Sequence, residues 1–393
     1  MRQLARNAEL RCRNRLFRLP SNVHWLSTAG NFLDRFNVHP FTNPPVYQST
    51  RSPTAIPPLL IDTFGRVHRS VRISVTDRCN IRCFYCMPAG DVAFAPRSAL
   101  LTFEEIIRVV SILAREGVQD VRLTGGEPLV RRDVPRLVAM IAAVPGVEDL
   151  AMTTNGILLP KVAVALREAG LKRLNISLDT LDEDVFKKIT RRDGVDRVLA
   201  GIEAAIAAGF EQLRLNALAI RGLTENEIES LVQFATSRHL TIRFIEYMPL
   251  DADRAWRDED VLSGDEVLSL IQARFGAIRP VAPPTDSQPS RDYELIDLPK
   301  SAAGFHPAVG VIRPVTAPFC GACDRVRLTA EGTIRNCLFS TDEWDLRKLL
   351  RENAGDGEIL ACIQDAVRHK RAGHLINRPG FSQPDRPMYS IGG

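Results

Sequence analysis

The sequence predicts an α/β protein in which helices cover a parallel sheet. Six short apolar runs, rich in β-branched residues, recur through the middle of the 393-residue chain, and helix-like intervals separate them. Strand-then-helix units joined by short turns are typical of parallel sheets. The expected strands are Val71–Val75, Val121–Leu123, Leu150–Thr153, Leu174–Leu178, Leu213–Ile220 and Ile242–Tyr247. Their order fits either an incomplete barrel or an open, doubly wound sheet.

Caps, prolines and glycines mark the expected helix boundaries. Thr102–Glu105 and Thr224–Glu227 both have the spacing of a capping box, and Pro160 suits the first turn of a helix. Helix ends are expected at Gly117, Gly170 and Gly209. A sixth helical run covers Gly264–Phe275, and the Pro- and Ser-rich stretch Pro280–Ser290 is expected to be a linker.

Composition and charge exclude several classes of protein. Hydrophobic residues make up 45% and charged residues 25%, as in ordinary globular proteins. No run approaches the ~18 uncharged apolar residues of a membrane span, which predicts a soluble protein that does not enter the membrane. Residues 1–60 hold eight Arg against two acids, so the rest of the chain carries −2 of the total charge of +4. A nearly neutral body argues against nucleic acid as a partner.

The N-terminal extension has the composition of a targeting peptide. Met1–Arg18 is rich in Arg, poor in acids and crudely amphipathic, which is typical of a mitochondrial transit peptide, and it lacks the apolar core of a secretory signal. We therefore expect residues 1–60 to be a targeting peptide and disordered linker, and the protein to reside in the mitochondrial matrix. Import into a plastid, or a basic tail without targeting function, are the alternatives.

Six of the eight cysteines form two tight groups. They are Cys79, Cys83 and Cys86, with spacing C-x3-C-x2-C, and Cys320, Cys323 and Cys337, with spacing C-x2-C-x13-C. In a chain without a secretory signal, such groups indicate metal binding or catalysis rather than disulfides. Three thiolates can hold three irons of a [4Fe–4S] cluster and leave the fourth iron open to a small molecule. A structural zinc site usually has four protein ligands, so an interaction protein with zinc at these cysteines is the less favoured alternative.

Polar residues recur at the ends of the expected strands. Active sites of parallel sheets form at the carboxyl ends of the strands, and unpaired polar groups in apolar strands cost free energy. Taken alone, any one such residue is explained as readily by a structural hydrogen bond as by a bound ligand. Their presence at all six strands indicates a bound ligand.

The first cysteine group resembles that of the radical S-adenosylmethionine (SAM) superfamily. The resemblance rests on C-x3-C-x2-C after the first strand, an aromatic residue before the last Cys, and Gly-Gly-Glu-Pro after the second strand. It implies a partial (β/α)6 TIM-type barrel and a [4Fe–4S] cluster whose open iron binds SAM. Reduction then cleaves SAM into methionine and a 5′-deoxyadenosyl radical. The implied SAM contacts are Tyr85, Gly126, Ser177 and Met248.

The second cysteine group narrows this resemblance to the GTP 3′,8-cyclase family. The narrower resemblance rests on Arg-x-Arg shortly after Cys323 and on the final residues Ile391-Gly392-Gly393. It extends from about Asp62 to Gly393. It implies a radical SAM barrel over residues 61–279 and a C-terminal extension over 280–393 that carries a second [4Fe–4S] cluster, whose open iron orients guanine. Gly392 and Gly393 are the implied catalytic residues. The implied GTP contacts are Arg72, Arg122, Thr153, Arg214, Arg325 and Arg327.

Two residues depart from the family pattern. Arg214 stands where relatives commonly have Lys, which keeps the charge but changes the reach of the side chain. Asp324 replaces an Asn that is frequent after the second Cys of the C-terminal group.

The resemblance implies the first step of molybdenum cofactor biosynthesis. The radical removes the ribose 3′ hydrogen of GTP, and the 3′ carbon attacks C8 to give (8S)-3′,8-cyclo-7,8-dihydroguanosine 5′-triphosphate. Expected partners are an external electron donor and a separate cyclic pyranopterin monophosphate synthase downstream. The sequence does not decide whether the chain forms a homodimer. The alternative is a radical SAM enzyme with an auxiliary cluster that acts on another substrate, such as a peptide.

Overall fold

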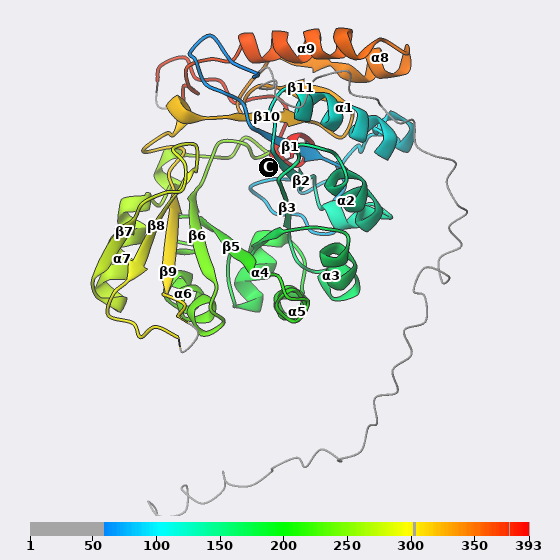
Figure 1. Cartoon of the computed structure of the whole chain (residues 1–393). Helices are drawn as coiled ribbons and strands as arrows, with labels where there is room; N and C mark the ends of the chain where they lie inside the picture. The colour runs from blue at the N-terminus through cyan, green and yellow to red at the C-terminus, as the bar shows by residue number, and fades with distance from the viewer. Residues whose placement is uncertain (1–58, 302–303, 377, 393) are drawn as a thin grey trace, which may run out of the picture. The chain divides into compact units, whose positions relative to one another are not determined.

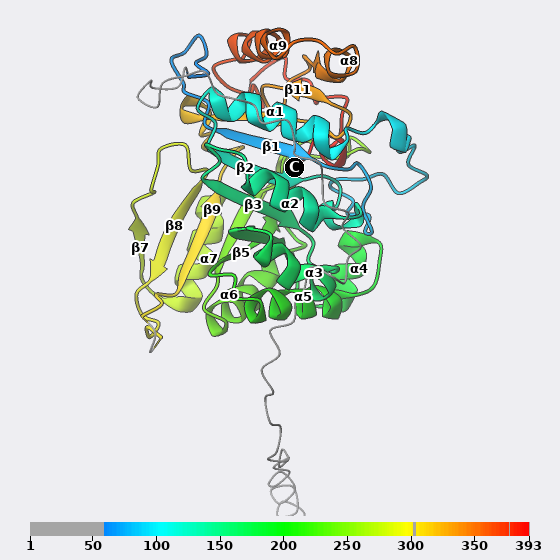
Figure 2. The ribbon, with the colours of Figure 1, turned by 45° about the vertical axis from the view of Figure 1, so that its right-hand side comes forward.

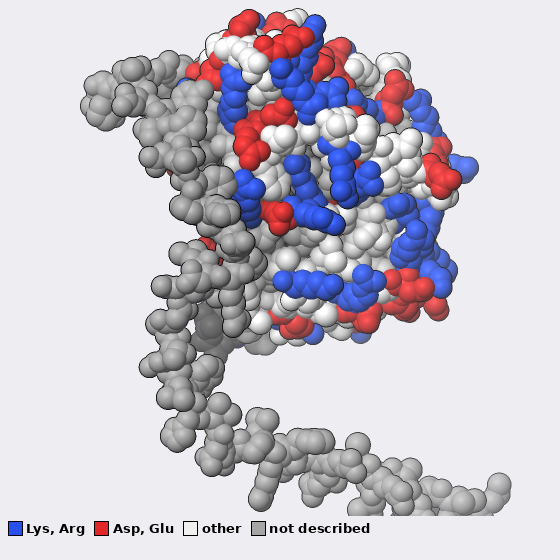
Figure 3. All heavy atoms as spheres, turned by 90° about the vertical axis from the view of Figure 1, so that its right-hand side faces the viewer, with Lys and Arg blue, Asp and Glu red and all other residues white. Residues whose placement is uncertain are grey.

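The computed structural model describes residues 59–301, 304–376 and 378–392. The expected targeting peptide and linker lie outside these residues except for Leu59 and Leu60. None of the described helices combines the length and the apolarity that a membrane span requires. Acidic and basic side chains are interspersed over the face shown in Figure 3, so this face carries no extended patch of one sign.

All six expected strands are present, and a helix follows each of them. The strands lie side by side in chain order, and every neighbouring pair is parallel. Two helices, instead of the single one expected, fill the interval between the fourth and fifth strands. The elements are β1 (Ser70–Ser74), α1 (Phe103–Arg115), β2 (Asp120–Thr124), α2 (Val134–Ala142), β3 (Asp149–Thr154), α3 (Leu159–Glu168), β4 (Arg173–Ser177), α4 (Glu183–Thr190), α5 (Val195–Ala207), β5 (Gln212–Ala219), α6 (Ile228–Ser237), β6 (Thr241–Glu246) and α7 (Gly264–Phe275).

The C-terminal part of the chain extends both edges of this sheet. Strand β9 pairs parallel with β6, and β10 pairs parallel with β1. Antiparallel strands complete the order β12-β11-β10-β1-β2-β3-β4-β5-β6-β9-β8-β7, so the sheet curves without closing. The C-terminal elements are β7 (Ile278–Val281), β8 (Ser290–Leu295), β9 (Ala308–Ile312), β10 (Arg325–Leu328), β11 (Thr333–Arg335), β12 (Trp344–Asp345), α8 (Leu346–Arg351), α9 (Asp356–Arg368) and α10 (Met388–Ile391). The fold is therefore the expected partial barrel (Figure 1).

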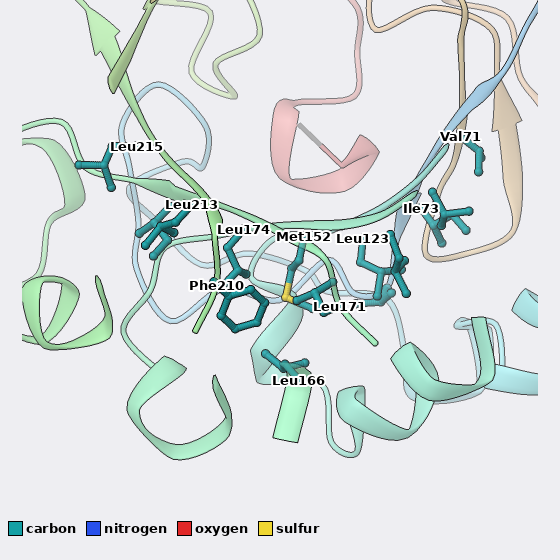
Figure 4. Close-up of a cluster of buried hydrophobic side chains, with 14 of the residues drawn as sticks. Val71, Ile73, Leu123, Met152, Leu166, Leu171, Leu174, Phe210, Leu213 and Leu215 are labelled. Atoms are coloured by element: carbon teal, nitrogen blue, oxygen red, sulfur yellow. The ribbon is translucent and has the colours of Figure 1, made fainter. Parts of the chain in front are cut away.

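The helices lie on the outer side of the curved sheet. Figure 4 shows Leu123, Met152 and Leu174 pointing from β2, β3 and β4 toward Leu166 of α3, and all four are fully buried. Burying one such side chain contributes about 1.5–3 kcal/mol, so this layer holds the helices on the sheet. Because side chains alternate along a strand, the residues between these apolar ones face the inner side of the barrel.

The two C-terminal helices pack beside the first barrel helix. Figures 1 and 2 both place α8 and α9 next to β11 and α1. Arg108 and Arg115 of α1 form ion pairs with Asp356 at the start of α9, with N–O distances of 2.9 and 2.6 Å. A carboxylate in the first turn of a helix also interacts favourably with the helix dipole. The C-terminal elements are thus fixed to the β1 edge of the barrel.

Most of the expected helix boundaries are confirmed. Thr102–Glu105 forms a complete capping box, and Pro160 lies in the first turn of α3. Positive φ angles follow three helices, at Gly117, Gly170 and Gly209. The capping box expected at Thr224 is wrong, because its hydroxyl donates to the carbonyl oxygen of Leu218 at 2.7 Å, and Glu227 accepts from Thr180 at 2.6 Å instead.

The stretch Pro280–Ser290 is a hairpin connection rather than the expected linker. Its first residues belong to β7 and its last to β8, and these strands are antiparallel, with Pro280 opposite Tyr293. The boundary expected between residues 279 and 280 falls within β7. A count of Pro and Ser did not distinguish a connection between paired strands from a connection between separate units.

Candidate active site

A single large cavity brings the expected site residues together. It has a volume of about 650 Å³ and is lined by the inner face of the barrel strands, the Cys79–Cys86 loop and the segments that carry the C-terminal cysteines. The expected residues that line it are Arg72, Cys79, Cys83, Tyr85, Cys86, Arg122, Gly126, Thr153, Ser177, Arg214, Met248, Cys320, Cys323, Arg325, Arg327 and Cys337. Of the two expected tail residues, Gly392 contacts one of these side chains, and Gly393 lies outside the described residues.

The first cysteine group lies on a loop that follows β1. Backbone hydrogen bonds tie this loop to the end of α4, because the amide of Arg82 donates to the carbonyl of Thr190 at 2.9 Å and the amide of Phe84 donates to that of Ile189 at 3.0 Å. The amide of Cys86 also donates to the carbonyl of Cys83 at 2.9 Å, which closes a tight turn. The three thiols are therefore held on a fixed backbone.

The chemistry of these three thiols fits a metal cluster. All three are free, and burial raises the pKa of Cys79 to about 11 and that of Cys83 and Cys86 further above its usual value. Thiolates become favourable in such a site when a metal ligates them. No group of His, Cys, Asp or Glu in the described residues is arranged around a single metal ion. The thiolates of a cubic cluster bind different irons, so they need not converge on one point.

The second cysteine group lies where two C-terminal strands begin and end. Cys320 and Cys323 directly precede β10, and Cys337 follows β11. The guanidinium of Arg66 donates to the carbonyl of Cys320 at 2.7 Å. Burial raises the pKa of Cys323, but nearby cations, with Lys370 first, lower it below its usual value. In this group the ammonium of Lys370 lies 3.5 Å from the sulfur of Cys323.

Tyr85 is fixed by a buried carboxylate. Its hydroxyl donates to Asp179 Oδ2 at 2.7 Å, and the other oxygen of Asp179 accepts from the amide of Leu218 at 2.8 Å. Burial raises the pKa of Asp179, and these two donors lower it in part. The aromatic ring thus has one orientation at the cavity wall, beside the first cysteine group.

The Gly-Gly-Glu-Pro turn supports the same loop. A Cβ at Gly126 would stand 2.4 Å from the carbonyl oxygen of Arg78, so the close approach that requires glycine here is to the backbone of the cysteine loop. Glu127 is buried and accepts hydrogen bonds from Thr154 Oγ1 and the amide of Asn155, both at 2.7 Å. Burial raises the pKa of Glu127 to about 7, against the effect of these donors. A contact between Gly126 and SAM stays a prediction.

Three arginines stand side by side on the inner face of the sheet. Arg327 of β10 is in register with Arg72 of β1, which is in register with Arg122 of β2. Burial, and then neighbouring charges, lower the pKa of Arg122 to about 9, that of Arg327 to about 10 and that of Arg72 well below its usual value. A guanidinium nevertheless stays protonated in proteins, so these shifts express an unfavourable crowding of buried positive charge. A bound polyanion would relieve it.

Gly392 reaches this row of arginines. The guanidinium of Arg327 donates from Nη1 to the carbonyl oxygen of Gly392. Gly392 has a φ of +72°, and a Cβ there would stand 2.5 Å from Thr124 Oγ1. Only glycine fits this position without strain.

Comparison with known proteins identifies the family. The chain matches the model of the radical SAM superfamily over residues 73–235 and that named Molybdenum Cofactor Synthesis C over residues 240–376. GTP 3′,8-cyclase of Rhodopirellula baltica is 54% identical over 338 residues, which cover 86% of this chain and 93% of that protein. The chain belongs to the GTP 3′,8-cyclase family. The GTP 3′,8-cyclase of Mycolicibacterium smegmatis is 45% identical over 337 residues, covering 85% of this chain and 92% of that protein.

As a member of this family the chain is a radical SAM enzyme, with a [4Fe–4S] cluster and SAM as its cofactors. The buried thiols of the first group fit that cluster. Among solved structures, methylornithine synthase is 20% identical and covers 54% of this chain and 63% of its own, with a TM-score of 0.43. A likeness of that degree carries no argument about function.

Two arginines of the cavity were not among the expected GTP contacts. Arg173 and Arg243 line the same wall as Arg214, whose pKa is lowered to about 10 by burial and by these two charges. Arg173 was missed because it precedes the expected fourth strand by one residue. Arg243 was expected only as one of the polar residues of the sixth strand, and it forms a 3.0 Å ion pair with Asp292 of β8.

Proposed function

We propose that this chain converts GTP to (8S)-3′,8-cyclo-7,8-dihydroguanosine 5′-triphosphate with a SAM-derived 5′-deoxyadenosyl radical, the first step of molybdenum cofactor biosynthesis. One observation carries the proposal: two groups of three free cysteines and a row of three arginines, of which Arg327 is buried and the other two are half-buried, face one cavity of about 650 Å³. Arginine forks suit triphosphate oxygens, because several donors converge on delocalised negative charge.

The second cysteine group is proposed to hold a second [4Fe–4S] cluster. Cys320, Cys323 and Cys337 are free and line the same cavity as the first group. These three thiolates would hold the cluster and leave one iron without a protein ligand, which would supply a position for a purine base in the cavity that Arg325 and Arg327 also line. An iron with an open position orients a base through a directional bond.

Each group of residues has a task in the proposed reaction. When bound, the first cluster and SAM supply the radical that removes the ribose 3′ hydrogen. Arg72, Arg122 and Arg327 bind the triphosphate and fix the distance of the ribose from the first cysteine group. Tyr85, held by Asp179, shapes the wall on the SAM side. The inner face of the partial barrel surrounds the reacting groups with protein, and a site shielded from water protects a reactive radical.

The alternative is a radical SAM enzyme with an auxiliary cluster and a different substrate, such as a peptide. The arginine row on the cavity wall favours a polyphosphate, because a neutral peptide would leave this positive charge uncompensated. The deciding experiment is anaerobic reconstitution with iron and sulfide counts, followed by product analysis with SAM, reductant and either GTP or ATP. Cyclised product from GTP alone supports the proposal. Deoxyadenosine formation without cyclised GTP would favour the alternative.

The proposed setting is the mitochondrial matrix, with an external electron donor and a separate cyclic pyranopterin monophosphate synthase that consumes the product. The Arg-rich, acid-poor residues 1–60 support import. Fusing these residues to a fluorescent protein tests it, with a matched fusion in which the eight arginines are replaced by glutamine. Import of the first fusion alone is expected, and equal distribution of both would contradict targeting.

A further inference from the structure

Lys370 follows α9 and lies against the second cysteine group. Its ammonium Nζ is 3.5 Å from Cys323 Sγ and 2.7 Å from the carbonyl oxygen of Arg325. The side chain is buried, with 4% of its residue surface exposed. The ammonium of Lys370 therefore bridges the sulfur of Cys323 and the backbone of Arg325, which lines the cavity.

A buried ammonium needs negative charge close by. Asp62 is engaged by Arg66, whose Nε lies 2.6 Å from Asp62 Oδ2. Lys370 forms no ion pair with any carboxylate in the described part of the chain, and its two hydrogen-bond partners are Cys323 Sγ and the carbonyl oxygen of Arg325. A protonated thiol is a weak acceptor, whereas a thiolate bound to iron is a full one.

Charge beside a ligand sulfur changes how easily a cluster accepts an electron. Reduction adds one negative charge to the cluster, and a cation within hydrogen-bond reach of a ligand stabilises that charge in a buried site. Hydrogen bonds to sulfur and local charge are among the factors that set cluster potentials. At the first group the corresponding side-chain contact is a neutral amide, since Asn155 Nδ2 lies 3.9 Å from Cys79 Sγ.

We propose that Lys370 is a positioning residue whose charged N–H···S contact with Cys323 raises the reduction potential of the second cluster. The inference rests on the proposed function, because it requires that this cluster exists. Lys370 also connects Cys323 with Arg325, because the same ammonium donates to the carbonyl oxygen of Arg325.

The test isolates the second cluster in the full chain. Cys83→Ser removes the first cluster, and Lys370→Met, Lys370→Arg or Lys348→Met is added to that background. Lys348 is an exposed lysine on α8 and serves as the matched control. Midpoint potentials are measured by redox titration followed by electron paramagnetic resonance, with iron and sulfide counts for every variant.

We expect Lys370→Met to shift the midpoint potential downward, Lys370→Arg to retain most of the parent value, and Lys348→Met to shift nothing. A cluster that is present in Lys370→Met at the parent potential would overturn the inference. If Lys370→Met holds no cluster, Lys370→Gln is measured in its place. Loss from both uncharged variants with retention in Lys370→Arg supports the charge, and loss from all three variants overturns it in favour of a purely steric role.

These outcomes are separable from failure of the proposed function. If Cys83→Ser alone, with Lys370 intact, contains no iron and sulfide, then the second cluster itself is absent and the proposed function is wrong in that respect. If that chain carries a cluster, the proposed cluster stands, and the result for Lys370 is decided by the potentials alone.

Discussion

Arg327 donates a hydrogen bond from its guanidinium to the backbone carbonyl oxygen of Gly392. Arg327 is the buried member of the arginine row on the inner face of the sheet, and Gly392 directly follows α10. The end of the chain is therefore bonded to a cation that the proposed function assigns to GTP. Upstream, Arg386 bonds to Glu331 and Glu343 at 2.6 and 2.7 Å, which fixes the approach to α10.

Removing Gly392 and Gly393 should lower cyclised GTP by orders of magnitude. The deletion frees the guanidinium of Arg327 and removes the backbone that lies against Thr124. Both clusters, the thermal midpoint and at least part of the deoxyadenosine formation should survive, because neither cysteine group is changed. Product analysis and iron counts on the same sample test this. Normal cyclisation by the truncated enzyme would show that the tail has no part in the reaction.

Gly392→Ala should mimic the deletion in a milder form. A left-handed backbone costs a residue with a Cβ roughly 1–2 kcal/mol, and the added methyl would lie 2.5 Å from Thr124 Oγ1. The tail is expected to leave its position, so the rate of cyclisation falls at least tenfold. Gly90→Ala is the matched control, because a Cβ at Gly90 meets no atom within 4 Å. Equal rates for the two variants would speak against a fixed position of Gly392.

Cys83→Ser should abolish reductive cleavage of SAM. Two thiolates cannot hold a cluster with one open iron, and Cys83 is the most deeply buried of the first group. Formation of 5′-deoxyadenosine with excess reductant is the measurement. Cys362→Ser, at a half-buried cysteine of α9, should leave it unchanged. Undiminished deoxyadenosine from Cys83→Ser would remove the first group from the chemistry.

Cys323→Ser should separate the two cysteine groups. The first cluster and deoxyadenosine formation should persist, whereas GTP binding weakens and cyclisation stops, because the purine loses the proposed iron that orients it. Equilibrium binding of GTP to the reconstituted variant, together with product analysis, distinguishes this from general damage. A parent rate of cyclisation would assign the second group a structural role.

The sequence predicted the parts of the molecule that depend on local pattern. Six strands and both cysteine groups were visible because alternation, spacing and glycine positions act within a few residues. The pairing of Ser70 with Arg325 was not predictable in this way, because it joins distant segments whose register depends on packing. That pairing is what brings Arg327 beside Arg72.

The misses have physical causes at particular residues. The hydroxyl of Thr224 donates to the carbonyl of Leu218 instead of capping the helix, so this contact replaces the local motif. Arg173 was missed because a strand boundary set by apolar residues began one residue late. Lys370 carries no spacing signal at all, and only the fold shows that it meets Cys323.

His68 should make stability depend on pH in the acid range. It is fully buried, its Nδ1 lies 3.0 Å from the carbonyl oxygen of Arg66, and a carbonyl can only accept, so Nδ1 carries the proton of the neutral ring. Burial, and then the charge of Lys370, lower the pKa of His68 from 6.5 to about 4, although Asp62 opposes this from 3.7 Å. Arg66 adds to the lowering.

The sign follows from proton uptake by the unfolded chain. Between pH 6.5 and pH 4 the unfolded chain binds a proton at His68 that the folded chain does not, so this contribution to stability is complete above pH 6.5 and is lost as the pH falls through 4. It amounts to roughly 3 kcal/mol in total and about 2 kcal/mol between pH 6.5 and pH 5.

His68→Asn keeps a donor for the carbonyl of Arg66 but does not titrate. Its free energy of unfolding should therefore fall about 2 kcal/mol less than that of the parent between pH 7 and pH 5. His239→Asn, at an exposed histidine with a φ of +57° that Asn tolerates, should behave as the parent does. Loss of clusters in acid affects the parent and both variants alike, so the difference in their free energies of unfolding reports on His68. Parallel pH profiles for His68→Asn and the parent would refute the role of His68 in this pH dependence.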